Sequence, residues 1–417
     1  MGEFTIIMYG RKLILLLIFT LFPWAVQSSV RIVSPSTPIQ PVLDHSNIGD
    51  TVFFRKGLYK QHDLIVRKKL VIIGEGFPVI DGESKFEVFI VTANDVIISG
   101  LQIQNIGRSS LIDMAAIKLR NSKRILVKDC RIYNATYGVY IENCSYTEVR
   151  NCIIKAVAKD ELQSGNGVHA WKSSHLSIKN NSISGHRDGI YFEFVTESDI
   201  CNNLSFGNIR YGLHFMFSHH DTYSHNTFSE NGAGVAVMYT KDVTMLNNTF
   251  YHNWGDASYG LLLKEISDSK IENNIFAKNT VGIFMEGCSR IHVSRNTFKE
   301  NGWAMRIQAS CDGNTFEKNN FLGNSFDVAT NGTLMLNLFT SNYWDKYDGY
   351  DLDKDGKGDV PYYPVSVYSV ISEQMPSTMI LYRSFLSTLM DQVEKVMPSI
   401  IPDLLKDDAP RIKKWNL

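Results

Sequence analysis

Imidazole and thioether side chains recur along one stretch of the chain at positions that could bind a soft metal ion. His214, Met216 and Met238 lie within "RYGLHFMFSHHDTYSHNTFSENGAGVAVMYT", residues 210–240, and His169 lies in the comparable stretch "GNGVHAWKSS". Nitrogen and sulfur ligands of this kind favour copper, especially Cu(I). The alternatives are contact with a partner protein and ordinary packing, which are the usual roles of a single methionine or histidine on a β face. The sequence leaves these readings open: a contact surface is the favoured one, and transient binding of copper is the alternative.

A second set of candidate ligands is the acidic loop "DLDKDGKGD". Asp351, Asp353 and Asp355 stand at alternate positions, a glycine follows at the sixth place, and Asp359 stands at the ninth. This spacing turns hard carboxylate oxygens toward one centre, as in an EF-hand loop that binds Ca²⁺. The twelfth position holds Tyr362 rather than glutamate, so the usual bidentate ligand is missing. The sequence leaves two readings open, a calcium site and an Asp/Gly turn without an ion.

An internal repeat defines the elements that must position these residues. A glycine followed by alternating apolar residues recurs in steps of 22 to 29 residues, at Gly138, Gly167, Gly189, Gly212, Gly234, Gly260 and Gly282. A second marker, Asn-x-Phe or Asn-x-Ile in most copies, follows the same steps, at Asn151, Asn181, Asn203, Asn226, Asn248, Asn274, Asn296 and Asn319. The segments between markers are short and alternating, without a helical period.

Coils of this length suit a parallel β-helix, in which each coil stacks on the last and asparagines form ladders of side-chain amides. A leucine-rich horseshoe is the main structural alternative, but the repeats lack its leucine consensus. We therefore predict an all-β fold, a right-handed parallel β-helix with a C-terminal helical tail. The predicted boundaries are a signal peptide at 1–29, the β-helix at 30–345, the acidic loop and end cap at 346–375, and an amphipathic helical tail at 376–417.

Alternation along each strand predicts which side chains face solvent. Counting from each repeat glycine, the first and third residues are apolar and should face the core, so the second and fourth face outward. The outward positions carry tryptophan, histidine, tyrosine and methionine, whereas a solvated face should carry mainly lysine, glutamate, serine and threonine. Such a stripe indicates a contact surface. The predicted partner surface consists of Trp171, Tyr191, Glu193, His186, His219, His220 and Met285.

The two ends of the chain differ from the repeat. Arg11 and Lys12 precede the apolar run "LILLLIFTLF", and small residues follow near residue 29, which is typical of a cleaved secretory signal. From Met375 onward, apolar residues fall at mostly helical spacing, which predicts a docking helix in the tail. Its predicted contact residues are Met379, Leu381, Phe385, Leu386, Leu389, Met390 and Val393. The alternative is a helix folded back on the end of the solenoid.

Several long stretches together resemble the NosD family. They are "GNGVHAWKSS", "GHRDGIYFEFVTESDI", residues 210–250, "WGDASYGLLLKEISDSKIENNIFAKNTVGIFMEG" and "NYWDKYDGYDLDKDGKGDVPY". The resemblance covers essentially the whole mature chain. It implies a periplasmic β-helix that docks on the membrane subunit of an ABC transporter and works with a lipoprotein copper chaperone to supply copper to nitrous-oxide reductase. The resemblance supplies no ligand set that can be assigned to single residues.

Other function classes are less well supported. The 42 Lys and Arg residues nearly balance the 43 Asp and Glu residues, so the charge gives no pull toward nucleic acid. A polysaccharide-binding or polysaccharide-cleaving protein is the main alternative, with Asp188, Glu193, Lys264 and Glu265 as candidate acid/base groups. These charges do not form the carboxylate pairs expected of a glycosidase. We therefore predict a protein without enzymatic activity, peripheral to the inner membrane.

Overall fold

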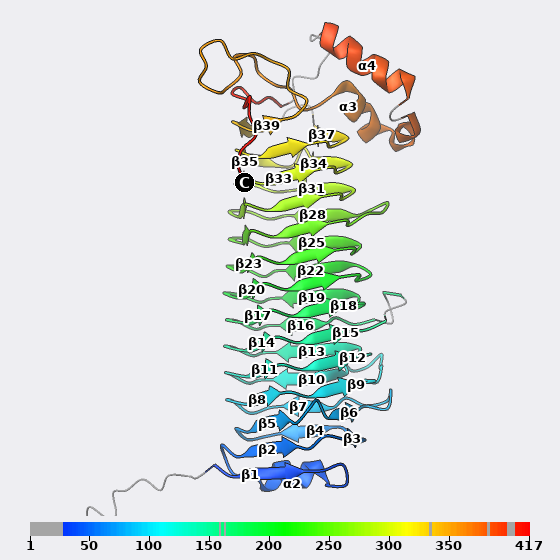
Figure 1. Ribbon diagram of the computed structural model, residues 1–417, viewed down its shortest axis with the longest axis vertical. Helices are drawn as coiled ribbons and strands as arrows, with labels where there is room; N and C mark the ends of the chain where they lie inside the picture. Colours follow the sequence, from blue (N-terminus) through cyan, green and yellow to red (C-terminus); the bar gives the residue numbers. More distant parts are fainter. Residues whose placement is uncertain (1–27, 158–159, 162–163, 333–335, 382–383, 398–404) are drawn as a thin grey trace, which may run out of the picture.

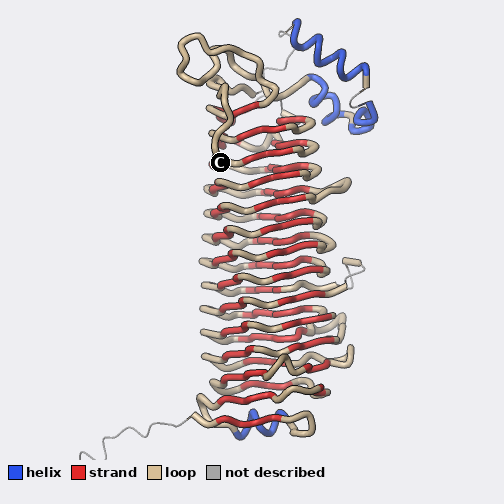
Figure 2. Tube along the Cα trace, viewed as in Figure 1, coloured by secondary structure: helices blue, strands red, loops and turns tan. Residues whose placement is uncertain are grey.

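The computed structural model is a right-handed parallel β-helix, as the repeat predicts (Figures 1 and 2). The structure describes residues 28–417 apart from 158–159, 162–163, 333–335, 382–383 and 398–404. The predicted signal peptide therefore lies almost entirely outside the described residues. Among the helices that are described, none is long and apolar enough to cross a membrane.

Each full coil contributes one strand to each of three sheets, and all neighbouring strands within a sheet are parallel. Sheet A consists of β1 (Val30–Val33), β2 (Thr51–Phe54), β5 (Val71–Gly74), β8 (Ile97–Ser99), β11 (Leu126–Lys128), β14 (Glu148–Arg150), β17 (Ser177–Lys179), β20 (Asp199–Cys201), β23 (Thr222–Ser224), β26 (Thr244–Leu246), β29 (Lys270–Glu272), β32 (His292–Ser294), β35 (Asp312–Glu317) and β38 (Leu336–Thr340).

Sheet B consists of β3 (Leu58–Tyr59), β6 (Val79–Asp81), β9 (Gln102–Gln104), β12 (Arg131–Tyr133), β15 (Ile153–Lys155), β18 (Ser182–Ser184), β21 (Leu204–Phe206), β24 (Thr227–Ser229), β27 (Thr249–Tyr251), β30 (Ile275–Ala277), β33 (Thr297–Lys299), β36 (Asn320–Leu322) and β39 (Tyr343–Trp344). Sheet C consists of β4 (Leu64–Val66), β7 (Phe89–Val91), β10 (Ala115–Arg120), β13 (Tyr137–Glu142), β16 (Val168–Trp171), β19 (Asp188–Glu193), β22 (Tyr211–Met216), β25 (Ala233–Met238), β28 (Tyr259–Lys264), β31 (Val281–Glu286), β34 (Trp303–Ile307) and β37 (Phe326–Ala329).

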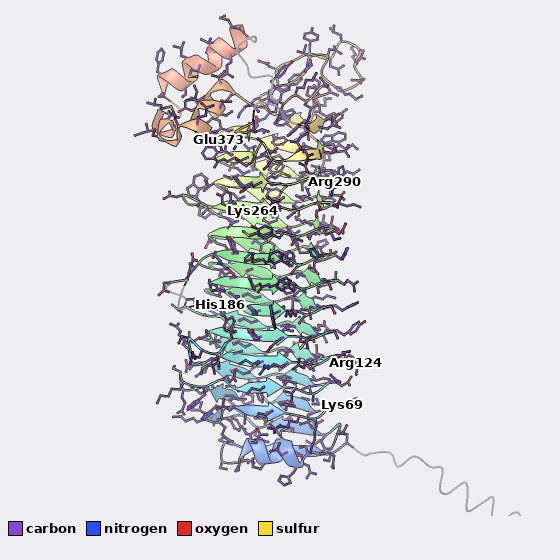
Figure 3. The ribbon with its side chains drawn as sticks, turned by 180° about the vertical axis from the view of Figure 1, so that it is seen from behind. Lys69, Arg124, His186, Lys264, Arg290 and Glu373 are labelled. Atoms are coloured by element: carbon purple, nitrogen blue, oxygen red, sulfur yellow. The ribbon has the colours of Figure 1, made fainter. Side chains whose placement is uncertain are left out.

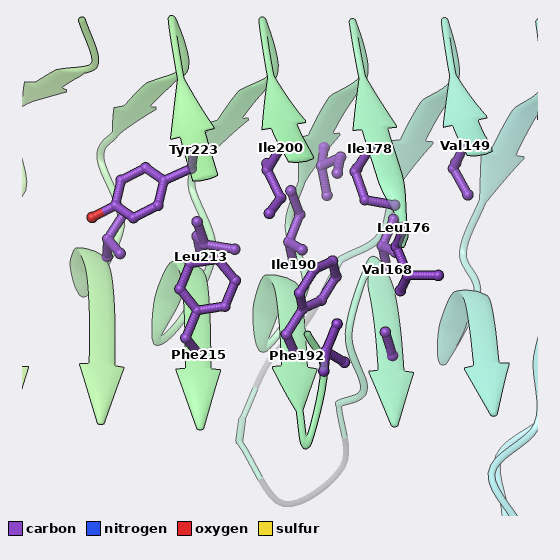
Figure 4. Packing of buried hydrophobic residues seen from close by; sticks show 14 of the residues in the cluster. Val149, Val168, Leu176, Ile178, Ile190, Phe192, Ile200, Leu213, Phe215 and Tyr223 are labelled. Carbon is purple, nitrogen blue, oxygen red and sulfur yellow. The ribbon is translucent and has the colours of Figure 1, made fainter. Parts of the chain in front are cut away.

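The core is a continuous apolar column between the sheets. Inward residues of sheet C such as Ile190, Phe192 and Phe215 are completely buried and point toward residues of sheet A such as Ile200 and Tyr223 (Figure 4). In the C-terminal coils of the solenoid, the aromatic rings of the Asn-x-Phe markers stack from coil to coil. The ring centroids of Phe250 and Phe276, for example, are 4.5 Å apart. From Phe228 to Trp344, one aromatic ring per coil thus fills the same place, which explains the repeated Asn-x-Phe marker; the earlier coils have mostly isoleucine there.

The asparagines of the markers form the predicted ladder. The side-chain amide of Asn226 donates to the side-chain oxygen of Asn248 at 3.0 Å, and that oxygen also accepts the backbone N–H of Asn226. The same pair of bonds joins Asn248 to Asn274 in the next coil. Both the turn backbone and the buried amides are therefore satisfied without water, which lets the turns pack tightly.

The two ends of the solenoid are covered differently. Helix α2 (Ile39–His45) lies across the first coil, and α3 (Val367–Gln374), η1 (Pro376–Leu381) and α4 (Phe385–Val396) lie beyond the last (Figure 1). Helix α3 begins inside the predicted end cap, and an ion pair of 2.7 Å between Glu373 and Arg306 ties it to sheet C. After the helices, the chain returns to the solenoid: Asp407 pairs with Phe339 and with Tyr362. The tail is therefore helical only in part.

Candidate functional site

Two columns of outward side chains run along sheet C through β16, β19, β22 and β25. The strand register places His169, Tyr191, His214 and Ala236 in one column, which we call the inner column. The same register places Trp171, Glu193, Met216 and Met238 in a second, which we call the outer column. Alternation therefore predicted correctly which side chains lie on the outer side of this sheet.

The inner column is buried nevertheless. His169 is 9% exposed, Tyr191 is 9% exposed and His214 is 5% exposed. The expectation that Tyr191 lies on an open contact surface is therefore wrong. Alternation predicts on which side of the sheet a side chain lies, but not whether other side chains bury it. Here the side chains are buried by their stacked neighbours in the column and by tyrosines at the starts of the strands.

His169 is held in an aromatic stack. Its ring lies between those of Tyr140 and Tyr191, with centroid separations of 4.7 and 4.9 Å. The side-chain amide of Asn166 lies 3.0 Å from its Nδ1. Burial lowers the pKa of His169 to about 4, so the ring is neutral at pH 7.

His214 points toward the start of the strands rather than toward the methionines. Its Nδ1 lies 3.6 Å from a carboxylate oxygen of Asp188, and its ring meets those of Tyr191 and Tyr211 edge-on. Asp188 is completely buried and receives two bonds from Arg210, at 2.9 and 2.5 Å. Burial opposes ionisation of Asp188, but hydrogen bonds and charges from His214 and Arg210 keep its pKa below the usual value.

Met216 and Met238 are the predicted metal ligands that the fold places side by side. They are register partners on β22 and β25, and both are half-buried. The hydroxyl of Tyr191 lies 3.8 Å from the sulfur of Met216, and burial raises the pKa of Tyr191 to about 12, so this hydroxyl keeps its proton at pH 7. The structure thus separates a thioether pair from the two histidines, which are engaged elsewhere.

The remaining predicted partner residues fall into three environments. Trp171, Glu193 and His219 are half-buried, and His220 is exposed, 3.4 Å from a carboxylate oxygen of Asp242. His186 is 1% exposed and lies at the edge of the solenoid opposite Arg124 and Arg290 (Figure 3). Met285 is completely buried in the core. The prediction that His186 and Met285 face a partner is wrong: Met285 is the third residue after its glycine and points inward, and His186 lies under neighbouring turns.

The structure adds a third row, which sequence analysis did not identify. Phe194, Phe217 and Tyr239 follow the outer column at the corner of three successive coils, and we call them the aromatic ladder. Their rings are stacked with centroids 5.2 and 5.1 Å apart. Alternation ends at this corner, so the strand rule said nothing about these residues. Alignment of the repeats would have shown three aromatic residues in one column.

The acidic loop brings three of its four predicted ligands together. One carboxylate oxygen from each of Asp351, Asp353 and Asp355 lies within 4.8 Å of the others. Asp359 instead accepts the backbone N–H of Leu352 at 2.7 Å and closes the loop. Within the described residues, this is the only group of three or more His, Cys, Asp or Glu side chains spaced for a metal ion. Calcium at this loop stays a prediction.

Helix α4 presents an apolar face to solvent. Phe385, Leu389 and Val393 are four residues apart, and Phe385 is 82% exposed. Leu381 is also exposed, whereas Met390 is half-buried beside α3. The side chains of Met379 and Leu386, also predicted to dock, lie outside the described part of the chain. The helix is therefore not buried in the solenoid, and its exposed face is apolar. An exposed apolar face is what a partner-binding helix should have.

Comparison with known proteins adds evidence that the geometry alone does not give. The sequence model described as "Periplasmic copper-binding protein (NosD)" matches residues 151–349, and the model of a right-handed β-helix region matches residues 74–165. A protein of Stutzerimonas stutzeri named "Probable ABC transporter binding protein NosD" is 22% identical over 355 residues, covering 80% of each chain.

A protein of the same name from Pseudomonas aeruginosa is 23% identical over 370 residues, covering 84% of this chain and 86% of its own. Among solved structures, a family 28 exopolygalacturonase of Yersinia enterocolitica superposes with a TM-score of 0.61 at 11% identity. That superposition covers 76% of this chain and 79% of the enzyme. At such low identity, the superposition shows the shared fold alone.

Proposed function

Because the chain is a member of the NosD family, we propose that it is a periplasmic accessory protein for copper-site assembly of nitrous-oxide reductase. In this proposal it docks on the membrane subunit of an ABC transporter and exchanges copper with a lipoprotein chaperone. The structural observation that supports this role most directly is the half-buried thioether pair, Met216 and Met238, on the outer face of sheet C.

The thioether pair suits a cargo metal better than a permanently bound one. Thioether sulfur is a soft ligand that favours Cu(I). His169 and His214 do not complete the site, since their rings are buried and packed among tyrosines, and the Nδ1 of His214 lies on the side of Asp188, 3.6 Å from a carboxylate oxygen. Two thioethers leave the coordination of Cu(I) incomplete, so a further ligand must come from the partner that gives or takes the ion. The copper is then held jointly during transfer and released afterwards.

The test replaces both ligands with an apolar residue of similar volume. The double variant Met216→Leu, Met238→Leu should bind Cu(I) more than about tenfold more weakly than the unmodified protein. About tenfold is the loss expected when a residue that only supports a ligand is replaced. Its thermal stability should stay close to that of the unmodified protein, because leucine and methionine are nearly interchangeable in packing. Competition with a Cu(I) chelator measures the affinity, and the copper content of the reductase in cells reports the biological consequence.

The matched control is Met375→Leu, which changes an exposed methionine far from the outer column. It should leave the Cu(I) affinity unchanged. Equal affinities of the double variant and the unmodified protein would exclude the thioether pair from copper exchange.

We further propose that helix α4 binds the membrane subunit of the transporter. The exposed face of Phe385, Leu389 and Val393 fits an apolar groove, as in helix-in-groove recognition. The variant Phe385→Lys, Leu389→Lys should therefore no longer co-purify with the transporter. Gln392→Lys introduces the same charge on an exposed polar position of α4 and should co-purify normally. Retention of the transporter by the double lysine variant would contradict the docking role.

A polysaccharide-directed function receives no comparable support from the outer face. Asp188 is enclosed and paired with Arg210, and Lys264 pairs with Glu286 at 3.2 Å. Two of the four candidate acid/base groups are therefore engaged in ion pairs, whereas glycoside hydrolysis needs two carboxyl groups facing one open groove. We accordingly propose a non-enzymatic role.

A further inference from the structure

The aromatic ladder lies at a corner where the chain takes a left-handed turn. Phe194, Phe217 and Tyr239 have φ angles of 54°, 50° and 54°, in the left-handed region that bulky residues avoid. Asn121 and Asn143, which follow the strands three and two coils below Phe194, have φ angles of 49° and 52°. Lys172 and Glu265, at the same corner of the adjoining coils, have φ angles of 48° and 52°, so the left-handed turn belongs to the repeat. These three coils differ from their neighbours because they carry bulky aromatic side chains at this corner, where the neighbouring coils carry polar ones.

The ladder also exposes apolar surface. Phe194 is 45% exposed and Tyr239 is 39% exposed, next to the half-buried Met216 and Met238. The rings stack face to face along the solenoid axis, with interplanar angles of 8° and 16°. Their faces therefore cover one another, and the ring edges are left for contact with a partner.

The chemistry of these edges selects a type of partner. Aromatic ring edges carry partial positive charge, and methionine sulfur packs favourably against them. In the four coils from Trp171 to Tyr239, the outer column and the corner row contain one lysine, Lys172, and one glutamate, Glu193. The surface is thus electrically neutral, which does not favour a polyanion such as an acidic polysaccharide or a phospholipid surface.

The size of the surface limits how the partner binds. Three coils at about 4.8 Å each extend over roughly 14 Å, so a strip as wide as it is long covers about 200 Å². A standard stable interface buries about 800 Å² per partner, about four times as much. A permanent dimer of this chain would need a far larger apolar area. A short loop of a transiently bound protein fits these dimensions.

We infer that the aromatic ladder is the docking strip for a methionine-bearing loop of the protein that exchanges copper with Met216 and Met238. The inference rests on the proposed function for the identity of that partner. The ladder holds the loop through sulfur–ring contacts, and the loop's methionine then lies beside the thioether pair and supplies the missing ligand. Binding of the loop does not itself require the metal, so docking and copper binding can be measured separately.

The probe is the synthetic peptide Gly-Met-Gly-Met-Gly without copper, compared with its norleucine counterpart, which keeps the length but lacks sulfur. Titration is followed by NMR through the peptide methyl signals, which ring currents of the ladder should shift. The methionine peptide should bind more tightly than the norleucine peptide by about threefold, the value of a few sulfur–ring contacts. The variant Phe194→Asn, Phe217→Asn, Tyr239→Asn should weaken its binding at least about tenfold.

The triple variant should stay folded and melt near the temperature of the unmodified protein, because asparagine adopts the left-handed conformation readily, which offsets the lost ring stacking. Tyr251→Asn, at an exposed tyrosine on sheet B, is the control and should bind the peptide normally. Absence of peptide binding, equal binding of both peptides, or equal binding by the triple variant would overturn the inference. A dimer of the unmodified protein that the triple variant dissolves would assign the ladder to self-association instead. Loss of Cu(I) affinity in the methionine double variant with intact peptide binding would leave this inference standing.

Discussion

Replacing Asp407 with alanine should lower the free energy of unfolding by about 3 kcal/mol, because it leaves several buried donors without an acceptor. Asp407 is completely buried at the C-terminal end of the asparagine ladder. Its carboxylate accepts the backbone N–H groups of Ser341 and Asn342 at 3.1 and 3.0 Å. It also accepts the side-chain amide of Asn342 at 3.0 Å and the indole N–H of Trp344 at 3.1 Å. One carboxylate thus closes the last coil and holds the returning chain.

Urea denaturation measures the effect, and two variants calibrate it. Asp407→Asn keeps one acceptor oxygen, as every asparagine of the ladder does, and should lose roughly half as much stability. Asp408→Ala removes a neighbouring carboxylate whose side chain is 63% exposed and should change little. A stability of Asp407→Ala equal to that of Asp408→Ala would show that the returning segment is not anchored through this residue.

The fold was predictable because one local rule repeats in every coil. Each coil has an inward pair such as Ile190 and Phe192, and the later coils add an asparagine that continues the amide ladder and an aromatic ring that stacks on the last. Errors in one coil do not change the period of the others. The returning segment was not predicted because only one of its residues, Asp407, continues the ladder. That residue is an aspartate where the repeat has asparagine, and it comes 65 residues after Asn342, which breaks the period.

The candidate site was predictable only in part. The sequence placed Met216 and Met238 in one column correctly, because register and alternation are set by the repeat. The direction of the His214 ring depends on Asp188, which lies in the preceding coil and is itself fixed by Arg210. No local pattern contains that arrangement. The exposure of a side chain likewise depends on neighbours from other coils. Tyr191 therefore lies on the outer side of sheet C and is nevertheless buried.

Replacing Asp221 with asparagine should make the protein more stable at neutral pH, by about 2 kcal/mol or more. Asp221 is 1% exposed, and burial raises its pKa to about 8, with smaller contributions from the charges of Asp199 and Glu197. One carboxyl oxygen accepts the backbone N–H of Ser198 at 2.8 Å. The equivalent bond in a later coil is made by Asn314, which accepts from Ile291 at 2.8 Å. A neutral amide therefore fits this column and keeps the bond.

The sign of the pH dependence follows from the direction of the shift. The folded chain keeps the proton of Asp221 up to its pKa of about 8, whereas the unfolded chain releases it near the ordinary aspartate pKa of 3.8. The folded state thus binds one more proton between these limits, and stability should fall by about 1.4 kcal/mol for each pH unit gained there. The stability added by Asp221→Asn should grow from near zero at pH 4 to its maximum near pH 8.

Urea denaturation of the variant and the unmodified protein at several pH values measures this difference in stability. The pH dependence of the titrating groups that both proteins contain cancels in the difference. Such groups include His169 and His186, whose pKa values burial lowers to about 4. Asp199→Asn removes an exposed neighbouring carboxylate and should give a nearly flat difference across the same range. A difference for Asp221→Asn that is equally flat would mean that the carboxyl of Asp221 is ionised in the folded protein. Because the same column elsewhere uses neutral groups, the steep difference is the outcome that the geometry requires.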